Sequence, residues 1–196
     1  MKTIQLSIAV LMLTLFSISC SKEDTAPTPT KQPSAEVSFE NIDGIQIGDD
    51  SSVGSFLEVT SSGIISNVNK MVLEMYVSHN NQKDLSFNLK APDGTMSYFI
   101  KRVGGTGDYV GSNKLRFSAA FTNRLSNDGT NFPSGNYKES QGSGEFATPV
   151  LLPIFSTFKD KSITGNWKLF IIDNVNNGID GEVFSWKIIF EEGALN

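Results

Sequence analysis

The stretch from His79 to Thr95 constrains the fold of this chain more than any other. Leu85, Phe87 and Leu89 alternate there with polar residues, which is the period of two expected of a β-strand. The Ala-Pro-Asp-Gly sequence at 91–94 ends this strand as a turn, because proline fixes φ and Asp-Gly tolerates a positive φ. We therefore predict a hairpin-like unit with one apolar face, and another layer must cover that face.

Segments of the same kind recur along the chain and predict a fold made almost entirely of strands. No segment carries the 3.6-residue period of an amphipathic helix. A short edge strand near 37–39 and a loop over 41–52 are expected, and residues 150–158 fit either a short helix or an irregular loop. The remaining predicted strands are 53–60, 71–78, 96–101, 115–121, 167–172 and 183–191. We predict an all-β jelly-roll sandwich of about eight strands.

The N-terminus is predicted to be an export signal rather than part of this fold. Residues 4–18 are largely apolar after a short positive start, and the run is too short for a spanning helix. The residues before Cys20 resemble a bacterial lipoprotein cleavage site, loosely at Ser17, where Leu is more usual. We expect a signal peptide over 1–19 and a lipidated Cys20, with cleavage elsewhere as the alternative. Because Cys20 is the only cysteine, disulfides within the chain are excluded.

The segment after the cysteine predicts a tether. Residues 20–36 contain three prolines and no large apolar residue before the domain, which is expected over 37–196. The acidic Ser-Lys-Glu-Asp at 21–24 resembles the tag of surface lipoproteins, although a solvated linker explains it equally. Removal of residues 1–19 leaves 15 basic and 21 acidic residues, a net charge of about −6. This acidity argues against a nucleic-acid partner. The export signal, Cys20 and the residues after it predict a lipoprotein on the surface, or in the outer membrane, of a Gram-negative bacterium.

Catalytic groups are scarce in the sequence. The chain has one histidine, His79, and a contact with Asp84 across the intervening loop is open. No Gly-x-Ser-x-Gly nucleophile motif is present, so no serine triad is visible. His79 is expected to bond loop backbone at a strand end. Trp167 and Trp186 lie on alternating apolar faces and are expected in the core, with a ligand platform as the alternative.

The order and spacing of several motifs resemble a known domain family. A histidine, a short loop, Asp-Leu, an alternating strand and a Pro-x-Gly-Thr turn are followed later by Gly-x-Trp-x-Leu and a Gly-rich turn before a second Trp. The residues that carry this pattern are His79, Asp84, Leu85, Pro92, Gly94, Thr95, Trp167, Gly181 and Trp186. Together they resemble the P domain, also called the P/Homo B domain, over roughly residues 51–191.

The resemblance implies an eight-stranded jelly roll of galactose-binding-like shape. Such domains accompany subtilisin-like serine endopeptidases, including proprotein convertases. There they support the catalytic domain and tune its calcium and pH dependence, without a catalytic residue of their own. This chain is therefore expected to be a stand-alone lipoprotein version of that domain.

Calcium is the one cofactor that the sequence leaves open. Several aspartates fall at predicted turns, where oxygen ligands can converge, although such residues also cap turn amides. Two departures from the family pattern weaken an inherited site. Phe117 is followed by Ser-Ala-Ala where bacterial members often carry Asp, and the Asp before the last strand is displaced by one position. The candidate ligands are Asp84, Asp93, Asp108, Asp173 and Asp180.

Three functions remain open at this level. The first is a non-catalytic accessory or interaction module for an exported serine protease, held at the membrane by its lipid. The second is a carbohydrate-binding or adhesion module that recognises a surface glycan. The third is an enzyme in its own right, which the single histidine and the missing nucleophile motif argue against.

Overall fold

The structure is a computed structural model that describes residues 34–126, 128–138, 140–141 and 155–196. Residues Pro33–Asn196 form a compact unit. The predicted signal peptide, Cys20 and most of the predicted tether lie outside the described residues. Within the described part of the chain, no helix is both long and apolar enough to cross a membrane.

Strands and three short 3-10 helices make up the described chain. The 3-10 helices are η1 (Val68–Lys70), η2 (Gln82–Asp84) and η3 (Phe155–Phe158). The strands are β1 (Val37–Asn41), β2 (Ile45–Ile47), β3 (Ser52–Val59), β4 (Met71–His79), β5 (Leu85–Lys90), β6 (Met96–Lys101), β7 (Leu115–Phe117), β8 (Gly135–Tyr137), β9 (Ser140–Gln141), β10 (Gly165–Asp173) and β11 (Gly181–Phe190).

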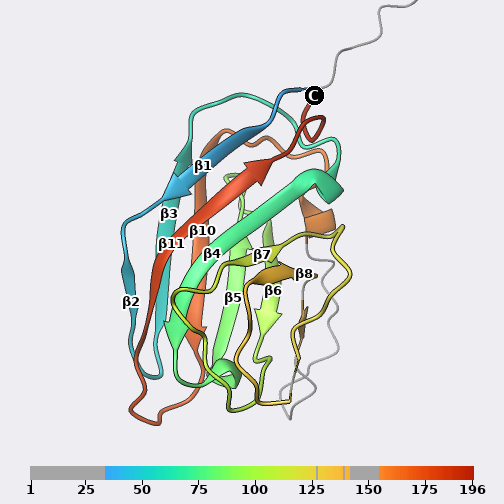
Figure 1. Ribbon diagram of the computed structural model, residues 1–196. Coiled ribbons are helices and arrows are strands. Elements are labelled where there is room, and N and C mark those ends of the chain that lie inside the picture. The colour runs from blue at the N-terminus through green and yellow to red at the C-terminus, as the bar shows by residue number, and fades with distance from the viewer. Residues whose placement is uncertain (1–33, 127, 139, 142–154) are drawn as a thin grey trace, which may run out of the picture. The chain divides into compact units, whose positions relative to one another are not determined.

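These strands form two sheets that lie face to face (Figure 1). The six-stranded sheet has the order β1-β11-β4-β7-β8. The sixth strand, β2, pairs with residues 181–183 of β11, on the same edge that β1 occupies along residues 186–190. The five-stranded sheet has the order β3-β10-β5-β6-β9. All pairs are antiparallel except β6 with β9 and β7 with β8. The predicted all-β sandwich is therefore confirmed.

The inward faces of both sheets form one hydrophobic core. Trp167 on β10 and Trp186 on β11 are fully buried within it, so the core interpretation of both residues is confirmed. The Trp186 indole N–H donates to the Ser55 hydroxyl on β3 at 2.8 Å, which joins the two sheets. The Trp167 indole N–H donates to the Ile163 carbonyl at 2.8 Å. Buried indole N–H groups need such partners, since an unpaired one costs about 1–3 kcal/mol.

Two local predictions differ from the structure, and a third, left open between a short helix and a loop, is resolved in part. The predicted loop over 41–52 contains β2, whose three residues are too few to show alternation and are held by pairing with β11. The strand expected over 115–121 ends at Phe117, because Ser118 starts a turn in which its carbonyl accepts the Phe121 N–H. In the ambiguous stretch 150–158, residues 155–158 form η3, whereas 150–154 lie outside the described residues.

The strand β5 is more deeply buried than its alternating sequence pattern predicts. Leu85, Phe87 and Leu89 face the core as expected. However, Ser86 and Asn88 on the other face are also buried, at 3% and 2% exposure. The strand is therefore not half-exposed, and β5 lies inside its sheet between β10 and β6.

The turn at residues 91–94 forms as the sequence predicts. The Gly94 N–H donates to the Ala91 carbonyl at 3.0 Å, and Gly94 has a φ of 91°. The Ala91 N–H donates to the Thr95 carbonyl at 2.8 Å, and the Thr95 N–H donates to the Asp93 carboxylate at 2.9 Å. The positive φ explains why glycine follows Asp93, because a side chain at that position would be strained.

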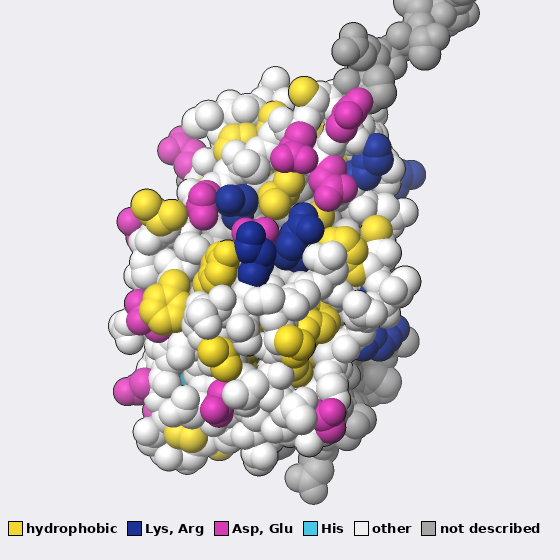
Figure 2. Space-filling model, in the orientation of Figure 1, with side chains coloured by type: hydrophobic (Ala, Val, Ile, Leu, Met, Phe, Trp, Pro, Cys, Tyr) yellow, Lys and Arg dark blue, Asp and Glu magenta, His cyan; other side chains and the backbone are white. Residues whose placement is uncertain are grey.

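The outer face of the six-stranded sheet carries a cluster of charged side chains. Figure 2 shows Lys and Arg side chains gathered near the middle of this face, with acidic ones beside them. Glu74 on β4 lies 3.5 Å from Lys114 and 3.4 Å from Arg116, and Lys187 lies 3.4 Å from Glu40. The charge of Glu74 raises the pKa of Lys114. Glu74 is itself buried, whereas the partly exposed pair of Lys187 and Glu40 contributes little stability.

Candidate functional site

The single histidine lies at the end of β4 and is closed off from solvent. Its exposed fraction is 1%, and Gly181 of β11 stands opposite it in the sheet. Its Nδ1 lies 3.1 Å from the Asn81 backbone N–H, and its Nε2 lies 3.1 Å from Asp173 Oδ2. Nε2–H donates to the Asp173 carboxylate, and Nδ1 also lies 3.0 Å from the Asn81 carbonyl oxygen, so the loop backbone offers it both a donor and an acceptor. This is the backbone contact at a strand end that the sequence analysis expected.

The carboxylate beside His79 is Asp173, not Asp84. Asp173 ends β10, 94 residues away in sequence, and its other oxygen accepts the Val175 N–H at 2.9 Å. Asp84 is also fully buried, but its Oδ2 accepts from the Asn177 side chain at 2.8 Å. Both oxygens of Asp173 and both ring nitrogens of His79 are therefore engaged, and the pair is sealed inside the fold.

Gly181 is required by the close packing at this corner. A Cβ at Gly181 would lie 2.6 Å from the Ser78 carbonyl oxygen and 2.7 Å from Cδ2 of the His79 ring. Its φ is not positive, so space rather than backbone conformation demands glycine here. This contact explains physically why the Gly before the last strand belongs to the same pattern as the histidine.

The loop from β10 to β11 is held to the β2–β3 loop by reciprocal bonds. Asp180 accepts the Asp49 N–H at 2.9 Å, and Asp49 accepts the Asn177 N–H at 2.9 Å. The Asn177 N–H lowers the pKa of Asp49. These bonds fix the loop beside Asp84 and Asp173.

The predicted calcium ligands do not converge. Asp84 and Asp173 meet at one end of β5, and Asp180 lies in the adjoining loop. Asp93 lies at the other end of the strand, 2.8 Å from Lys161, which lowers its pKa to about 2. Asp108 binds through its backbone N–H and carbonyl to Asn131 and Gln82. In the described chain, no three His, Cys, Asp or Glu residues are grouped to hold a metal ion.

The fit to calcium is therefore poor. Calcium takes six to eight oxygen ligands, whereas the two buried carboxylates of Asp84 and Asp173 are largely used within the protein. One oxygen, Asp84 Oδ1, is buried without a hydrogen-bond partner among the described residues. A single open carboxylate oxygen does not make a calcium site, and no step of the proposed function involves the ion.

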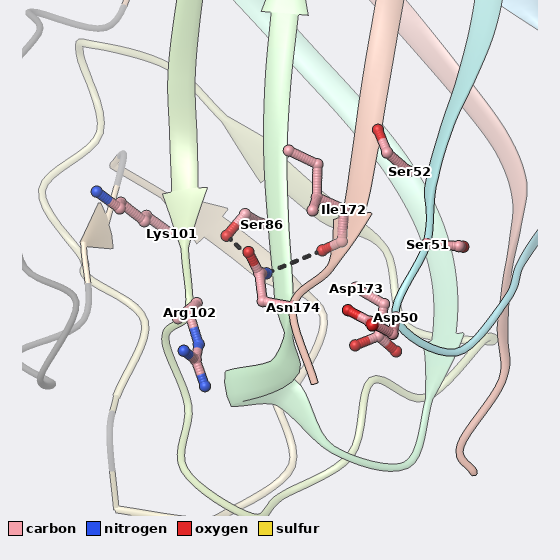
Figure 3. A pocket seen from close by; sticks show the side chains of 9 residues that line it. All are labelled: Asp50, Ser51, Ser52, Ser86, Lys101, Arg102, Ile172, Asp173 and Asn174. Atoms are coloured by element: carbon pink, nitrogen blue, oxygen red, sulfur yellow. Dashed lines mark hydrogen bonds between the residues drawn. The ribbon is translucent and has the colours of Figure 1, made fainter. Parts of the chain in front are cut away.

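A polar pocket of about 600 Å³ opens next to this corner, at the same end of the five-stranded sheet (Figure 3). Figure 3 shows Lys101 and Arg102 on one side, Asp50 and Asp173 on the other, and Asn174 between them. The Asn174 amide donates to the Asp84 carbonyl, the Ser86 hydroxyl and the Ile172 carbonyl. The lining residues are Asp50, Ser51, Ser52, Ser86, Lys101, Arg102, Ile172, Asp173 and Asn174.

Sequence reasoning missed this pocket, although one signal was available. Lys101 and Arg102 are adjacent basic residues at the end of a strand, just before a Gly-rich loop. Arg102 adopts a left-handed backbone with a φ of 50°, which is uncommon for a residue other than Gly, Asn or Asp. The other walls come from the ends of β3, β5 and β10, which only the sheet order brings together.

Comparison with known proteins gives a family match over most of the domain. The profile described as proprotein convertase P-domain matches residues 68–190, which covers everything from η1 to the end of β11. No curated protein shows a significant match to the sequence.

Two solved structures are similar in part. A serine protease of Aeromonas sobria is 14% identical to this chain, with a TM-score of 0.40. The alignment covers 80% of this chain and 27% of the protease chain. The complex of that serine protease with its chaperone gives 13% identity, a TM-score of 0.39, and coverage of 81% and 27%. This chain therefore spans about a quarter of the length of these structures.

Proposed function

The chain belongs to the proprotein convertase P-domain family, and on that premise we propose that residues 37–196 act as a non-catalytic accessory module for a subtilisin-like serine protease. The observation that carries the proposal is the family match across β4 to β11, the strands that build the His79 corner. The partner would be an exported serine endopeptidase.

The chemistry of the His79 corner supports a structural role. A histidine that acts as a general base must reach the proton it removes. The side chains of His79 and Asp173 have no solvent-exposed surface, and their polar atoms are bonded to each other and to backbone. The pair resembles two members of a triad in distance alone, because no substrate can reach the imidazole.

We further propose that Cys20 carries a lipid and that residues 20–36 tether the module to a membrane, at the outer surface of a Gram-negative cell. The lipoprotein-like residues before Cys20 and the proline-containing segment after it support this proposal. A Cys20→Ala variant is expected to move from the membrane fraction to the soluble fraction and to lose incorporation of labelled palmitate. Retention of both in the variant would contradict the anchor.

The protease proposal can be tested with the full-length chain in its native membranes. The protein would be crosslinked, affinity-purified and treated with a fluorophosphonate probe, which labels active serine hydrolases. We expect a labelled co-purifying protein identified as a subtilisin-like protease, and no label on this chain. A mock purification from cells that lack the tagged chain is the control. Label on this chain, or no enriched serine hydrolase, would overturn the proposal.

The carbohydrate-binding alternative has one observation in its favour, the polar pocket beside Asn174. Its volume of about 600 Å³ lies within the usual range for small-molecule sites. The two functions are compatible, because a module can bind a protease through one surface and a small ligand through another.

A further inference from the structure

We propose that the module binds its serine protease through the outer face of the five-stranded sheet, and that the protease meets it with an apolar patch that carries carboxylates. The inference rests on the proposed function, because the protease is the partner, and it adds where the two proteins meet. The residues of this surface, which we call the aromatic–lysine face, are Phe56, Lys90, Met96, Tyr98, Lys168 and Phe170.

Large apolar side chains stand on this face where polar ones are expected. An antiparallel sheet that packs on a core with one face usually presents polar residues on the other. Phe56 on β3 is instead 58% exposed, and Met96 on β6 is 40% exposed. Phe170 and Tyr98 are partly exposed and stand on either side of Asn88 in the sheet. Exposed apolar side chains gathered in this way mark a site of association.

The sheet register joins the exposed residues into one row across four neighbouring strands. Lys168 of β10 stands opposite Phe56 on one side and opposite Lys90 of β5 on the other. Lys90 in turn stands opposite Met96 of β6. The row therefore has an apolar side chain at each end and two lysines in the middle.

The two lysines carry charges that the described chain does not neutralise. Lys168 and Lys90 are direct cross-strand neighbours, and like charges at such positions repel each other. Among the described residues, neither ammonium group forms an ion pair with a carboxylate, and Glu58 on the same face of β3 pairs with neither. Carboxylates of a partner placed over this pair would offset the repulsion and give the contact its specificity.

Aromatic rings hold the charge of Lys168 within the apolar part of the face. Its Nζ lies 3.9 Å from the centroid of the Phe170 ring and 4.7 Å from that of the Phe56 ring. Gly54 leaves room for this arrangement, because a Cβ there would overlap the Lys168 side chain. The ammonium group therefore has a defined position in the free domain, and a partner carboxylate need not order it.

The same features favour a protein partner over other occupants. In a two-fold dimer the face would meet itself and bring the lysine pairs of both copies together, which their charges oppose. A glycan would need several hydrogen-bonding groups beside the rings, whereas the ends of the row are Phe56 and Met96. An apolar protein surface with carboxylates matches both the ends of the row and its centre.

The test applies crosslinking, affinity purification and fluorophosphonate labelling to variants of the full-length chain in native membranes. Lys168→Glu reverses one charge of the face and should still fold, because it places a carboxylate opposite Lys90. Phe56→Ser removes the most exposed ring. Each variant should recover at least tenfold less of the labelled subtilisin-like protease than wild type does, since losing one anchor or charge contact of an interface has an effect of that size.

Two matched variants outside the face serve as controls. Phe184→Ser changes a phenylalanine that is 42% exposed on β11 of the other sheet, and Lys159→Glu changes an exposed lysine just after η3. Both controls should recover the protease as wild type does. Melting temperatures close to that of wild type would show that all four variants are folded.

The outcomes separate this surface from the proposed function. If Lys168→Glu and Phe56→Ser recover the protease as well as the controls do, the surface is wrong and the protease partner stands. If wild type recovers no labelled serine hydrolase, both proposals fail.

Two further measurements distinguish the other occupants. We expect the purified Cys20→Ala chain to sediment as a monomer and not to bind vesicles of anionic phospholipid. A dimer that Phe56→Ser dissociates would assign the face to a second copy of the chain, and vesicle binding that Phe56→Ser abolishes would assign it to the membrane. Either result would refute a protease at this face.

Discussion

His79 and Asp173 show how a pair of residues suited to catalysis can serve architecture instead. Each is buried, one hydrogen bond joins them, and the backbone N–H groups of Asn81 and Val175 donate to their other polar atoms. A buried carboxylate without its partner is costly, because the protein cannot replace the lost bond with water. The pair therefore specifies how β4 and β10 meet, and its value lies in stability.

Replacement of Asp173 by Asn is expected to lower the free energy of unfolding by about 3 kcal/mol, as for other broken buried pairs. Chemical denaturation monitored by Trp fluorescence would measure the loss. Asp160→Asn is the matched control, because the Asp160 side chain is 74% exposed and 4.0 Å from its lysine. We expect the control to change stability by less than about 0.5 kcal/mol. Equal effects of the two changes would contradict the structural role.

Asp93 should make a small, pH-dependent contribution to stability. The hydrogen bond from Lys161 is the main cause that lowers the pKa of Asp93 from 3.8 to about 2. Because the folded pKa is below the unfolded one, the contribution is complete above about pH 4 and disappears as the pH falls to about 2. Since both side chains are about 40% exposed, the contribution should stay below about 1 kcal/mol.

Thermal unfolding of wild type and Asp93→Asn between pH 2 and pH 7 would measure this contribution. The melting temperatures should converge at the acid end and differ slightly at pH 7. A difference that grows toward low pH would have the wrong sign and refute the ion-pair account.

At the scale of elements, close approach between strands matters as much as hydrophobic pattern. Two glycines lie where the chain enters β11, Gly178 in the preceding loop and Gly181 at the start of the strand, and they are glycine for different reasons. Gly178 has a φ of 75° and open space around it, whereas Gly181 touches the backbone of β4. Gly178 is therefore required by its backbone conformation, and Gly181 by the lack of space for a side chain.

This difference predicts unequal losses of stability on substitution. Gly181→Ala should destabilise the domain by about 1–3 kcal/mol, because its methyl group would overlap the Ser78 carbonyl. Gly178→Asn should cost less than about 1 kcal/mol, since Asn tolerates the left-handed region. Denaturant midpoints of both variants would check the prediction. If Gly178→Asn were the more damaging change, the packing at Gly181 would not be the constraint described.

The length of a strand decides whether the sequence alone can predict it. Strands such as β4, β10 and β11 are long enough for alternation to show, and their positions follow from pattern alone. Three-residue strands such as β2 are defined by their neighbours, so no local pattern indicates them. Likewise, the His79–Asp173 pair and the pocket join residues far apart in sequence. Sheet order alone brings them together.

For the whole domain, the first and last strands lie side by side. β1 pairs with β11 over its full length, and the Leu195 N–H donates to the Ser34 hydroxyl at 3.1 Å. The Gly193 N–H also donates to the Ser34 carbonyl at 2.8 Å. These contacts make the start of the domain part of its closure rather than a loose end.

Chains that begin at different points should therefore differ in stability. A chain that starts at Pro33 keeps every described contact and should melt within about 2 °C of the full-length protein. A chain that starts at Ile42 lacks β1 and bares half of one edge of β11, so it should melt several degrees lower and self-associate. Calorimetry and size-exclusion chromatography would show both effects. A monomeric, equally stable Ile42 chain would refute the closure.

The position of β11 has a further consequence during synthesis. It is the last strand of the domain to be synthesised, yet β1, β2 and β4 all pair directly with it. Until residues 181–190 have been synthesised, nothing joins β1 and β2 to β4, and the other sheet has no complete partner. The domain therefore cannot complete its six-stranded sheet and its core until this strand has been synthesised.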